Sequence, residues 1–122
     1  MANSQERIAV FKSLADHGPI YGLVNNAGIA TPNLLEEFDF NVYESVMTIN
    51  ATAVAELTAA VVPSMIQNKS GRIINISSEL ILGFATRTAY SASKAAVASF
   101  ARTWALELGK YNICLLYTSD AA

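Results

Sequence analysis

The stretch that decides the fold is Arg72-Ile73-Ile74-Asn75-Ile76-Ser77, a short and almost continuously apolar run. Runs of this kind are typical of strands that are buried on both faces of a parallel sheet. Residues 20–25 form a second run of the same type. The sequence therefore predicts two strands that lie side by side in one parallel sheet.

Helical patterns precede, separate and follow these two strands. Asn3 with Glu6 resembles a capping box, which predicts the start of a first helix. Asn41 with Glu44 resembles a second one, at the start of a long apolar helix that reaches about Asn68. A third helical pattern covers residues 90–109 and is apolar around most of its circumference. Because parallel strands need crossover helices, this order predicts an α/β protein with the central βαβα portion of a doubly wound parallel sheet.

Composition excludes several classes of function. The chain has 122 residues, is 52% hydrophobic and carries a net charge of -2, as expected for one packed globular domain. Its few Lys and Arg residues are scattered, which argues against nucleic acid as a partner. Uninterrupted apolar stretches fall short of the ~20 residues that span a bilayer, so we expect no membrane partner. The polar start of the chain is unlike a signal peptide, which predicts a cytoplasmic protein. One His and one Cys predict no metal site.

Polar motifs follow both predicted strands. Asn25-Asn26-Ala27-Gly28 ends the first strand, and Ser77-Ser78 ends the second. Carboxyl ends of parallel strands share one edge of a sheet, where open α/β sheets bind ligands. Judged on residue types alone, the first motif could equally be an ordinary turn, and the serine pair could be a turn or a helix cap.

Two further polar features lie on the predicted helices. Asn50 places an amide within a Val, Ile and Ala surface, where burial without a partner would cost about 1 to 3 kcal/mol. It either bonds to local backbone or has a functional partner, and the residues alone do not decide between these. Tyr90 and Lys94 are four residues apart and share one helix face, where they could simply cover apolar surface with their stems.

Taken together and in this order, these motifs resemble those of the short-chain dehydrogenase/reductase family. The resemblance rests on Asn25-Asn26-Ala27-Gly28, Met47-Thr48-Ile49-Asn50, the serine pair and Tyr90-Ser91-Ala92-Ser93-Lys94, and it covers residues 8–113. It implies a Rossmann-like fold and an NAD(P)-dependent oxidoreductase that transfers hydride between NAD or NADP and a small-molecule carbonyl or secondary alcohol.

The resemblance also assigns roles to single residues. Tyr90 becomes the general acid/base, Ser78 orients the substrate carbonyl, and Asn50 perturbs its helix and holds a water in a relay that leads to Lys94. An ammonium beside a phenol favours the phenolate, which a proton-transferring tyrosine needs. The gap from Ser78 to Tyr90 is one residue shorter than is usual in the family, so Ser77 remains an alternative for the carbonyl.

The cofactor contacts follow from the same resemblance. Asn25 is expected to brace neighbouring strands instead of touching the nucleotide. The residues implied in cofactor binding are Asn26, Ala27, Gly28, Tyr90 and Lys94. The choice between NAD and NADP, the direction of reaction and the substrate stay open.

Two features predict that the chain is an internal fragment. The family's glycine-rich phosphate turn, Thr-Gly-x-x-x-Gly-x-Gly, is not found in it, so residues 1–113 would be part of a longer domain. Residues 114–122 resemble a translated sequencing adapter and would be non-native. On this view the complete protein is a homodimer or homotetramer, because the family pairs the helices over residues 42–68 and 90–109 across a two-fold axis. A dehydratase or epimerase that uses the same Tyr and Lys, or a non-catalytic binding module, remains an alternative.

Overall fold

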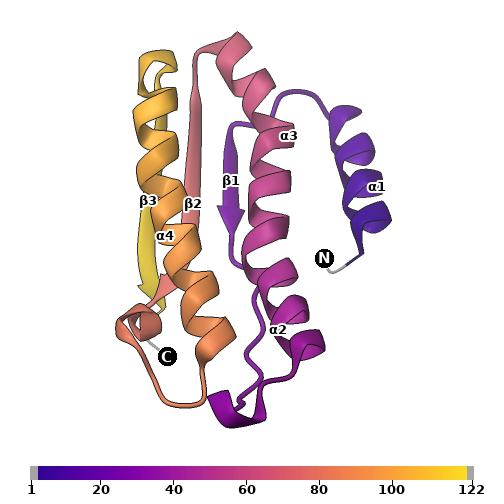
Figure 1. The fold of residues 1–122 in the computed structure, drawn as a ribbon. Coiled ribbons are helices and arrows are strands. Elements are labelled where there is room, and N and C mark those ends of the chain that lie inside the picture. Colours follow the sequence, from indigo (N-terminus) through magenta and orange to yellow (C-terminus); the bar gives the residue numbers. More distant parts are fainter. Residues whose placement is uncertain (1–2, 121–122) are drawn as a thin grey trace.

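The computed structural model describes residues 3–120, and its centre is a parallel sheet with the strand order β1-β2-β3. The strands are β1 (Gly22–Asn25), β2 (Gly71–Ser78) and β3 (Ile113–Asp120). Both pairings are parallel, and β1 is joined to β2 by helices that cover one face (Figure 1). The α/β class and the Rossmann-like parallel sheet predicted from the sequence are therefore confirmed.

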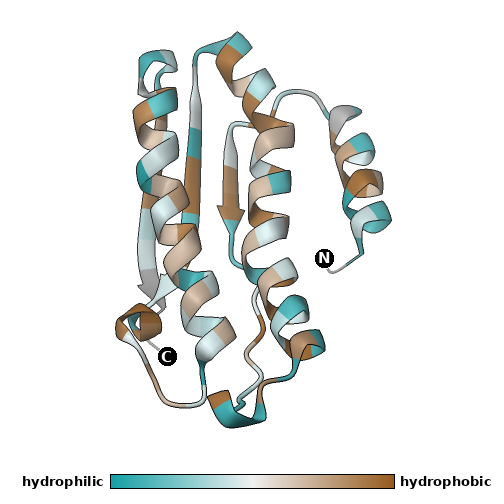
Figure 2. Ribbon diagram, viewed as in Figure 1, coloured by the Kyte–Doolittle hydropathy of each residue, from teal (hydrophilic) through white to brown (hydrophobic). Residues whose placement is uncertain are grey.

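Four α-helices accompany the sheet: α1 (Ser4–Ala15), α2 (Phe40–Met47), α3 (Ala53–Asn68) and α4 (Thr88–Leu108). α3 and α4 lie next to each other on one face, and α1 packs against the outer side of α3 (Figure 1). Among the described residues, no α-helix covers the opposite face. Figure 2 shows hydrophobic residues along β1 and β2 and a mixture of polar and hydrophobic residues on the helices.

Of the two helix caps predicted from the sequence, the one at Asn3 is confirmed. The Asn3 side chain accepts hydrogen bonds from the N–H groups of Gln5 and Glu6, at 2.8 and 3.2 Å, and so caps α1. The capping box at Asn41 is wrong. Asp39 is the N-cap of α2 and accepts the N–H of Asn41 at 2.9 Å, because its carboxylate stands one position before the helix begins.

The sequence predicted one long helix that reaches about Asn68, but this helix is interrupted in the structure. A π-helical turn, Thr48–Thr52, separates α2 from α3. It widens the helix by one residue and places Asn50 and Ala51 in the interior. Such turns are frequent at functional sites, and this one lies beside the carboxyl end of β1.

The third strand was not recognised from the sequence. Residues 114–120 extend β3 alongside β2, in a register that runs from Arg72 opposite Cys114 to Ser78 opposite Asp120. β2 therefore has a neighbour on each side. The adapter origin of residues 114–122 stays a prediction, and residues 121 and 122 lie outside the described part of the chain.

The core lies between the sheet and the two helices α3 and α4. Its fully buried members Met65 and Ile73 contact side chains from α4 and β3. The cluster consists of Val61, Met65, Ile73, Leu108 and Ile113. A partly buried salt bridge ties α1 to α3: Arg7, which is 3% exposed, donates to both carboxylate oxygens of the more exposed Glu56 at 2.9 and 3.0 Å. Hydrogen bonding from Arg7 lowers the pKa of Glu56 below its ordinary value.

One stretch is apolar enough to cross a membrane by length and composition, which was not expected from the sequence. It is Phe40–Asn68, with 29 residues, in which an 18-residue window has a mean hydropathy of 1.5. A core helix of a soluble protein passes the same test, and α3 contributes Val61 and Met65 to the core. The finding is therefore weak evidence for a membrane-spanning segment.

Candidate active site

Tyr90 and Lys94 lie in the first two turns of α4, at the carboxyl edge of the sheet. Lys94 is only 5% exposed, and its Nζ donates a hydrogen bond to the carbonyl oxygen of Ile76 in β2 at 3.0 Å. The same Nζ lies 5.9 Å from the centre of the Tyr90 ring. The two side chains share one face, as their spacing predicted, and the ammonium is held next to the phenol.

Gly28 brings the main chain after β1 into this group. A Cβ on Gly28 would lie 3.2 Å from Lys94 Nζ and 3.4 Å from Asn50 Oδ1. Three segments that are far apart in the sequence thus converge at one point: the turn after β1, the π-helical turn and α4. A side chain at this position would crowd Lys94 Nζ, which would have to shift by a few tenths of an ångström, whereas glycine leaves both polar groups in place.

The Asn50 amide is fully buried and hydrogen-bonded to residues that are distant in the sequence. Its Oδ1 accepts the N–H of Ile29 at 2.8 Å, and its Nδ2 donates to the carbonyl oxygen of Ile29 at 2.8 Å and to Ser93 Oγ at 3.1 Å. The alternative that the Asn50 amide bonds to local backbone is therefore wrong. The amide instead ties the turn after β1 to α4.

Ser93 is a site residue that the sequence analysis missed. It is fully buried, accepts from Asn50 and donates to the carbonyl oxygen of Tyr90 at 2.8 Å. Its hydroxyl therefore connects Asn50 to the main chain of Tyr90. The only signal in the sequence was a serine three positions after Tyr90, on the same helix face.

The two serines at the end of β2 have different hydrogen-bond partners. Ser77 Oγ donates to the carbonyl oxygen of Lys94 at 2.8 Å, so its single proton is used to brace β2 against α4. Ser78 Oγ accepts the N–H of Leu80 at 3.2 Å, which leaves its own proton for another acceptor. The arrangement favours Ser78 over Ser77 for holding a substrate oxygen.

Asn25 braces the strands, as predicted. Its Nδ2 donates to Asn75 Oδ1 at 2.8 Å and to Thr58 Oγ1 at 3.2 Å, and Asn75 Nδ2 donates in turn to the carbonyl oxygen of Val97 at 3.1 Å. This buried chain of amides links β1, β2, α3 and α4. Asn75 had no assigned role in the sequence analysis, although it faces Asn25 in the strand register.

Asn26 and Ala27 are exposed at the end of β1 and line an apolar groove of about 280 Å³. Ile49 and Val10 belong to the same groove, so it lies between α1, the π-helical turn and β1. Its size and mostly apolar lining suit part of a small-molecule cofactor. Within residues 3–120, no three His, Cys, Asp or Glu side chains lie together in a way that could hold a metal ion.

The fold and this edge of the sheet define the chain as a Rossmann-like α/β protein with a polar cluster at the carboxyl ends of β1 and β2. More particularly, the chain belongs to the short-chain dehydrogenase family, which it matches over residues 1–117.

Curated relatives and a solved structure agree with this assignment. The chain is 40% identical over 110 residues to the 3-oxoacyl-acyl-carrier-protein reductase of Thermotoga maritima, covering 89% of the chain and 45% of that enzyme. It is 42% identical over 99 residues to the 5-keto-D-gluconate 5-reductase of Escherichia coli, covering 80% and 39%. A short-chain dehydrogenase structure from Streptomyces avermitilis superposes with a TM-score of 0.91 at 32% identity, covering 97% and 44%. The chain thus spans less than half the length of these relatives.

Proposed function

We propose that this chain is part of a longer oxidoreductase that transfers hydride between NAD or NADP and a carbonyl or secondary alcohol, with Tyr90 as the general acid/base. The observation that carries the proposal is the convergence of Tyr90, the buried Lys94 and Gly28 at the carboxyl edge of the sheet. The names of the relatives support it, because they describe reductases that act on a keto group in an acyl chain or a sugar acid.

The residues present fit a nicotinamide cofactor. Gly28 leaves space where any side chain would press on Lys94, and Asn26 and Ala27 line the adjoining groove. These residues, with Tyr90 and Lys94, would hold the cofactor. When bound, NAD or NADP supplies or accepts the hydride.

The chain's own residues manage the proton and the substrate oxygen. Tyr90 gives its phenolic proton to the carbonyl oxygen in reduction and removes the alcohol proton in oxidation. The Lys94 ammonium stabilises the phenolate that results. Ser78 donates a hydrogen bond to the same oxygen and so fixes the direction of the carbonyl. Asn50, through Ile29 and Ser93, keeps the three segments of the site in register.

The test uses the complete protein and its Tyr90→Phe variant. With 3-oxoacyl thioesters and keto sugars as substrates, turnover followed at the nicotinamide absorbance should fall by about 100-fold or more in the variant, because the proton donor is lost. Cofactor binding should persist, since little volume changes. Tyr111→Phe, at the opposite end of α4, is the matched control.

Each of the other outcomes would indicate a different function for the complete protein. Near wild-type turnover in Tyr90→Phe would refute the role of Tyr90. Conversion of substrate without net change at the nicotinamide absorbance would indicate the dehydratase or epimerase, and cofactor binding without any turnover would indicate a binding module.

A further inference from the structure

Thr86 adopts a backbone conformation that its side chain disfavours. Its φ is +69°, in the left-handed region. Among the described non-glycine residues, the others with positive φ are Lys69 and Asn112. Neither of those is β-branched, whereas a threonine in this region is a genuine outlier. The surrounding structure must therefore hold Thr86 in place.

The loop after β1 supplies this restraint. Asn33 N–H donates to the carbonyl oxygen of Thr86 at 2.9 Å, and Asn33 pairs with Arg87 in a parallel bridge. Arg87 closes the turn from the other side: its Nη1 donates to Thr86 Oγ1 at 2.6 Å, and its guanidinium lies 5.7 Å from the centre of the Phe84 ring. We call these contacts of Asn33, Thr86 and Arg87 the Asn33 clamp.

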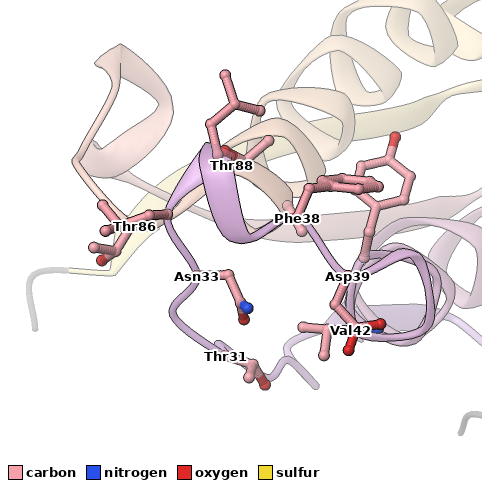
Figure 3. Close-up of a pocket in the computed structure, with 11 residues that line it drawn as sticks. Thr31, Asn33, Phe38, Asp39, Val42, Thr86 and Thr88 are labelled. Atoms are coloured by element: carbon pink, nitrogen blue, oxygen red, sulfur yellow. The ribbon is translucent and has the colours of Figure 1, made fainter.

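The two segments joined by the clamp lie close together. Figure 3 shows Thr31 and Asn33 on one segment and Thr86 and Thr88 on the other, around a shared pocket. The pocket measures about 20 Å³, which is room for about one water molecule. The clamp is thus a direct contact between the loop after β1 and the start of α4.

α4 begins immediately after the clamp. Arg87 is its N-cap residue and makes no side-chain hydrogen bond to the free N–H groups of the first turn, but its carbonyl oxygen accepts the N–H of Ser91 at 2.8 Å. Tyr90 lies in that first turn. The direction of the turn is therefore set by the backbone at Thr86 and Arg87.

We propose that Thr86 is a positioning residue: its left-handed conformation, held by the Asn33 clamp, fixes the first turn of α4 and thereby the place of the Tyr90 hydroxyl. The proposal rests on the proposed function of Tyr90. A misplacement of about 1 Å at a reacting group can lower a rate about 100-fold, so a small loosening at Thr86 would be visible in kcat.

Two substitutions at Thr86 separate conformation from side chain. Thr86→Gly removes the strain but also frees the backbone to leave the left-handed region. Thr86→Asn removes much of the strain, keeps a side-chain acceptor for Arg87 and favours the left-handed region. In the complete protein, Thr86→Gly should lower kcat by about 10- to 100-fold with KM changed far less, and Thr86→Asn should retain wild-type kcat.

Lys69→Gly is the matched control. It also replaces a residue of positive φ by glycine, although Lys69 is less strained than Thr86, and it does so at the end of α3, next to the start of β2 and therefore at the opposite edge of the sheet from Tyr90. Its kcat should equal that of the wild type. Tm should not fall in Thr86→Gly or in Lys69→Gly, whereas a merely structural role for Thr86 would lower Tm together with kcat.

Hydrogen exchange at the Ser91 amide gives a readout that does not depend on activity. Exchange should become faster in Thr86→Gly and stay unchanged in Thr86→Asn. Unchanged Ser91 exchange in Thr86→Gly, or an equal loss of kcat in both Thr86 variants, would overturn the proposal. If the complete protein shows no hydride transfer, the proposed function fails, and the Ser91 exchange still decides whether the clamp fixes the turn.

Discussion

At the scale of single residues, the site depends on how closely the main chain at Gly28 approaches Lys94. Lys94 Nζ cannot move aside freely, because it is bonded to the carbonyl oxygen of Ile76. Gly28→Ala would place a methyl group 3.2 Å from that Nζ and 3.4 Å from Asn50 Oδ1. In the complete protein we expect cofactor affinity to fall by about tenfold, or about 1.4 kcal/mol, measured by nucleotide fluorescence titration.

Gly109→Ala provides the control for this substitution. Gly109 has an ordinary φ of -57°, and a Cβ there meets no atom within 4 Å. Its cofactor affinity should match that of the wild type. Equal affinities for the wild type and Gly28→Ala would show that the space at Gly28 is not part of the cofactor site.

The site residues that could be predicted from the sequence have partners nearby in the chain, whereas those that were missed have partners far away in it. Tyr90 and Lys94 are visible because their relation is local, one helical turn apart. Ser93 was missed because the partner that gives it meaning, Asn50, is 43 positions away. A small polar residue in an apolar helix has the same pattern whether it faces solvent or a buried amide. Asn41 was misjudged since Asp39, an equally good cap, stands two positions earlier.

At the scale of elements, the buried amides of Asn25 and Asn75 fix how the strands and helices meet. Asn75→Ala would leave one N–H of Asn25 and the carbonyl oxygen of Val97 without this partner in the interior. We expect a loss of about 1 to 3 kcal/mol in the free energy of unfolding, the usual cost of a buried polar group left unpaired. Urea unfolding of the complete protein measures it.

Asn68→Ala is the comparison for the amide chain. Asn68 is exposed at the end of α3, and its side chain reaches only Ser64, at 3.5 Å. That variant should stay within about 0.5 kcal/mol of the wild type. If both variants lose the same small amount, the amide chain does not determine the packing of β1 and β2.

The elements predicted from the sequence were those with a clear apolar period. β1, β2 and α4 were located to within about two residues, in line with the usual uncertainty at element ends. The apolar period gave no sign of the π-helical turn Thr48–Thr52, because one extra residue in a turn barely disturbs such a pattern, and only the family resemblance implied that Asn50 perturbs its helix. β3 was missed because residues 114–120 resemble foreign sequence, although their apolar members can pair with β2.

At the scale of the whole molecule, the exposed surfaces of α3 and α4 combine small apolar residues with polar ones, and Leu106 is their one large exposed hydrophobic residue in the described part of the chain. Leu106 is 88% exposed, and a groove of about 190 Å³ between the helices is lined by Ala59, Val62 and Trp104. The Trp104 ring stacks on Phe100, with 5.0 Å between ring centres. Surfaces of this kind mark sites of association.

We therefore expect the complete protein to be a homodimer or homotetramer through these two helices. Sedimentation at micromolar concentration should show the assembly, and Leu106→Arg should shift it towards smaller species. Arg102→Ala lies on the same helix and removes less apolar surface than Leu106→Arg, so it should leave the assembly unchanged. A wild-type protein that sediments only as a monomer would contradict the expectation.

The last prediction concerns the 122-residue chain made as it stands. Parallel sheets are normally covered on both faces, yet here Val24 and Leu116, which flank Ile74 in the register, are each 59% exposed on the face opposite the helices. The outer edge of β1 also has no partner strand among the described residues.

We expect this chain to bind neither NADH nor NADPH and to unfold without a sharp transition, or to aggregate. The polar cluster around Lys94 is present, but the apolar face of the sheet that would have to be buried to stabilise the fold stays in water. Its burial therefore does not offset the entropy cost of ordering the chain, about 1 to 2 kcal/mol per residue. Fluorescence titration with both nucleotides and a thermal melt test this together. A cooperative melt with saturable binding would show that these residues suffice for a folded cofactor-binding domain.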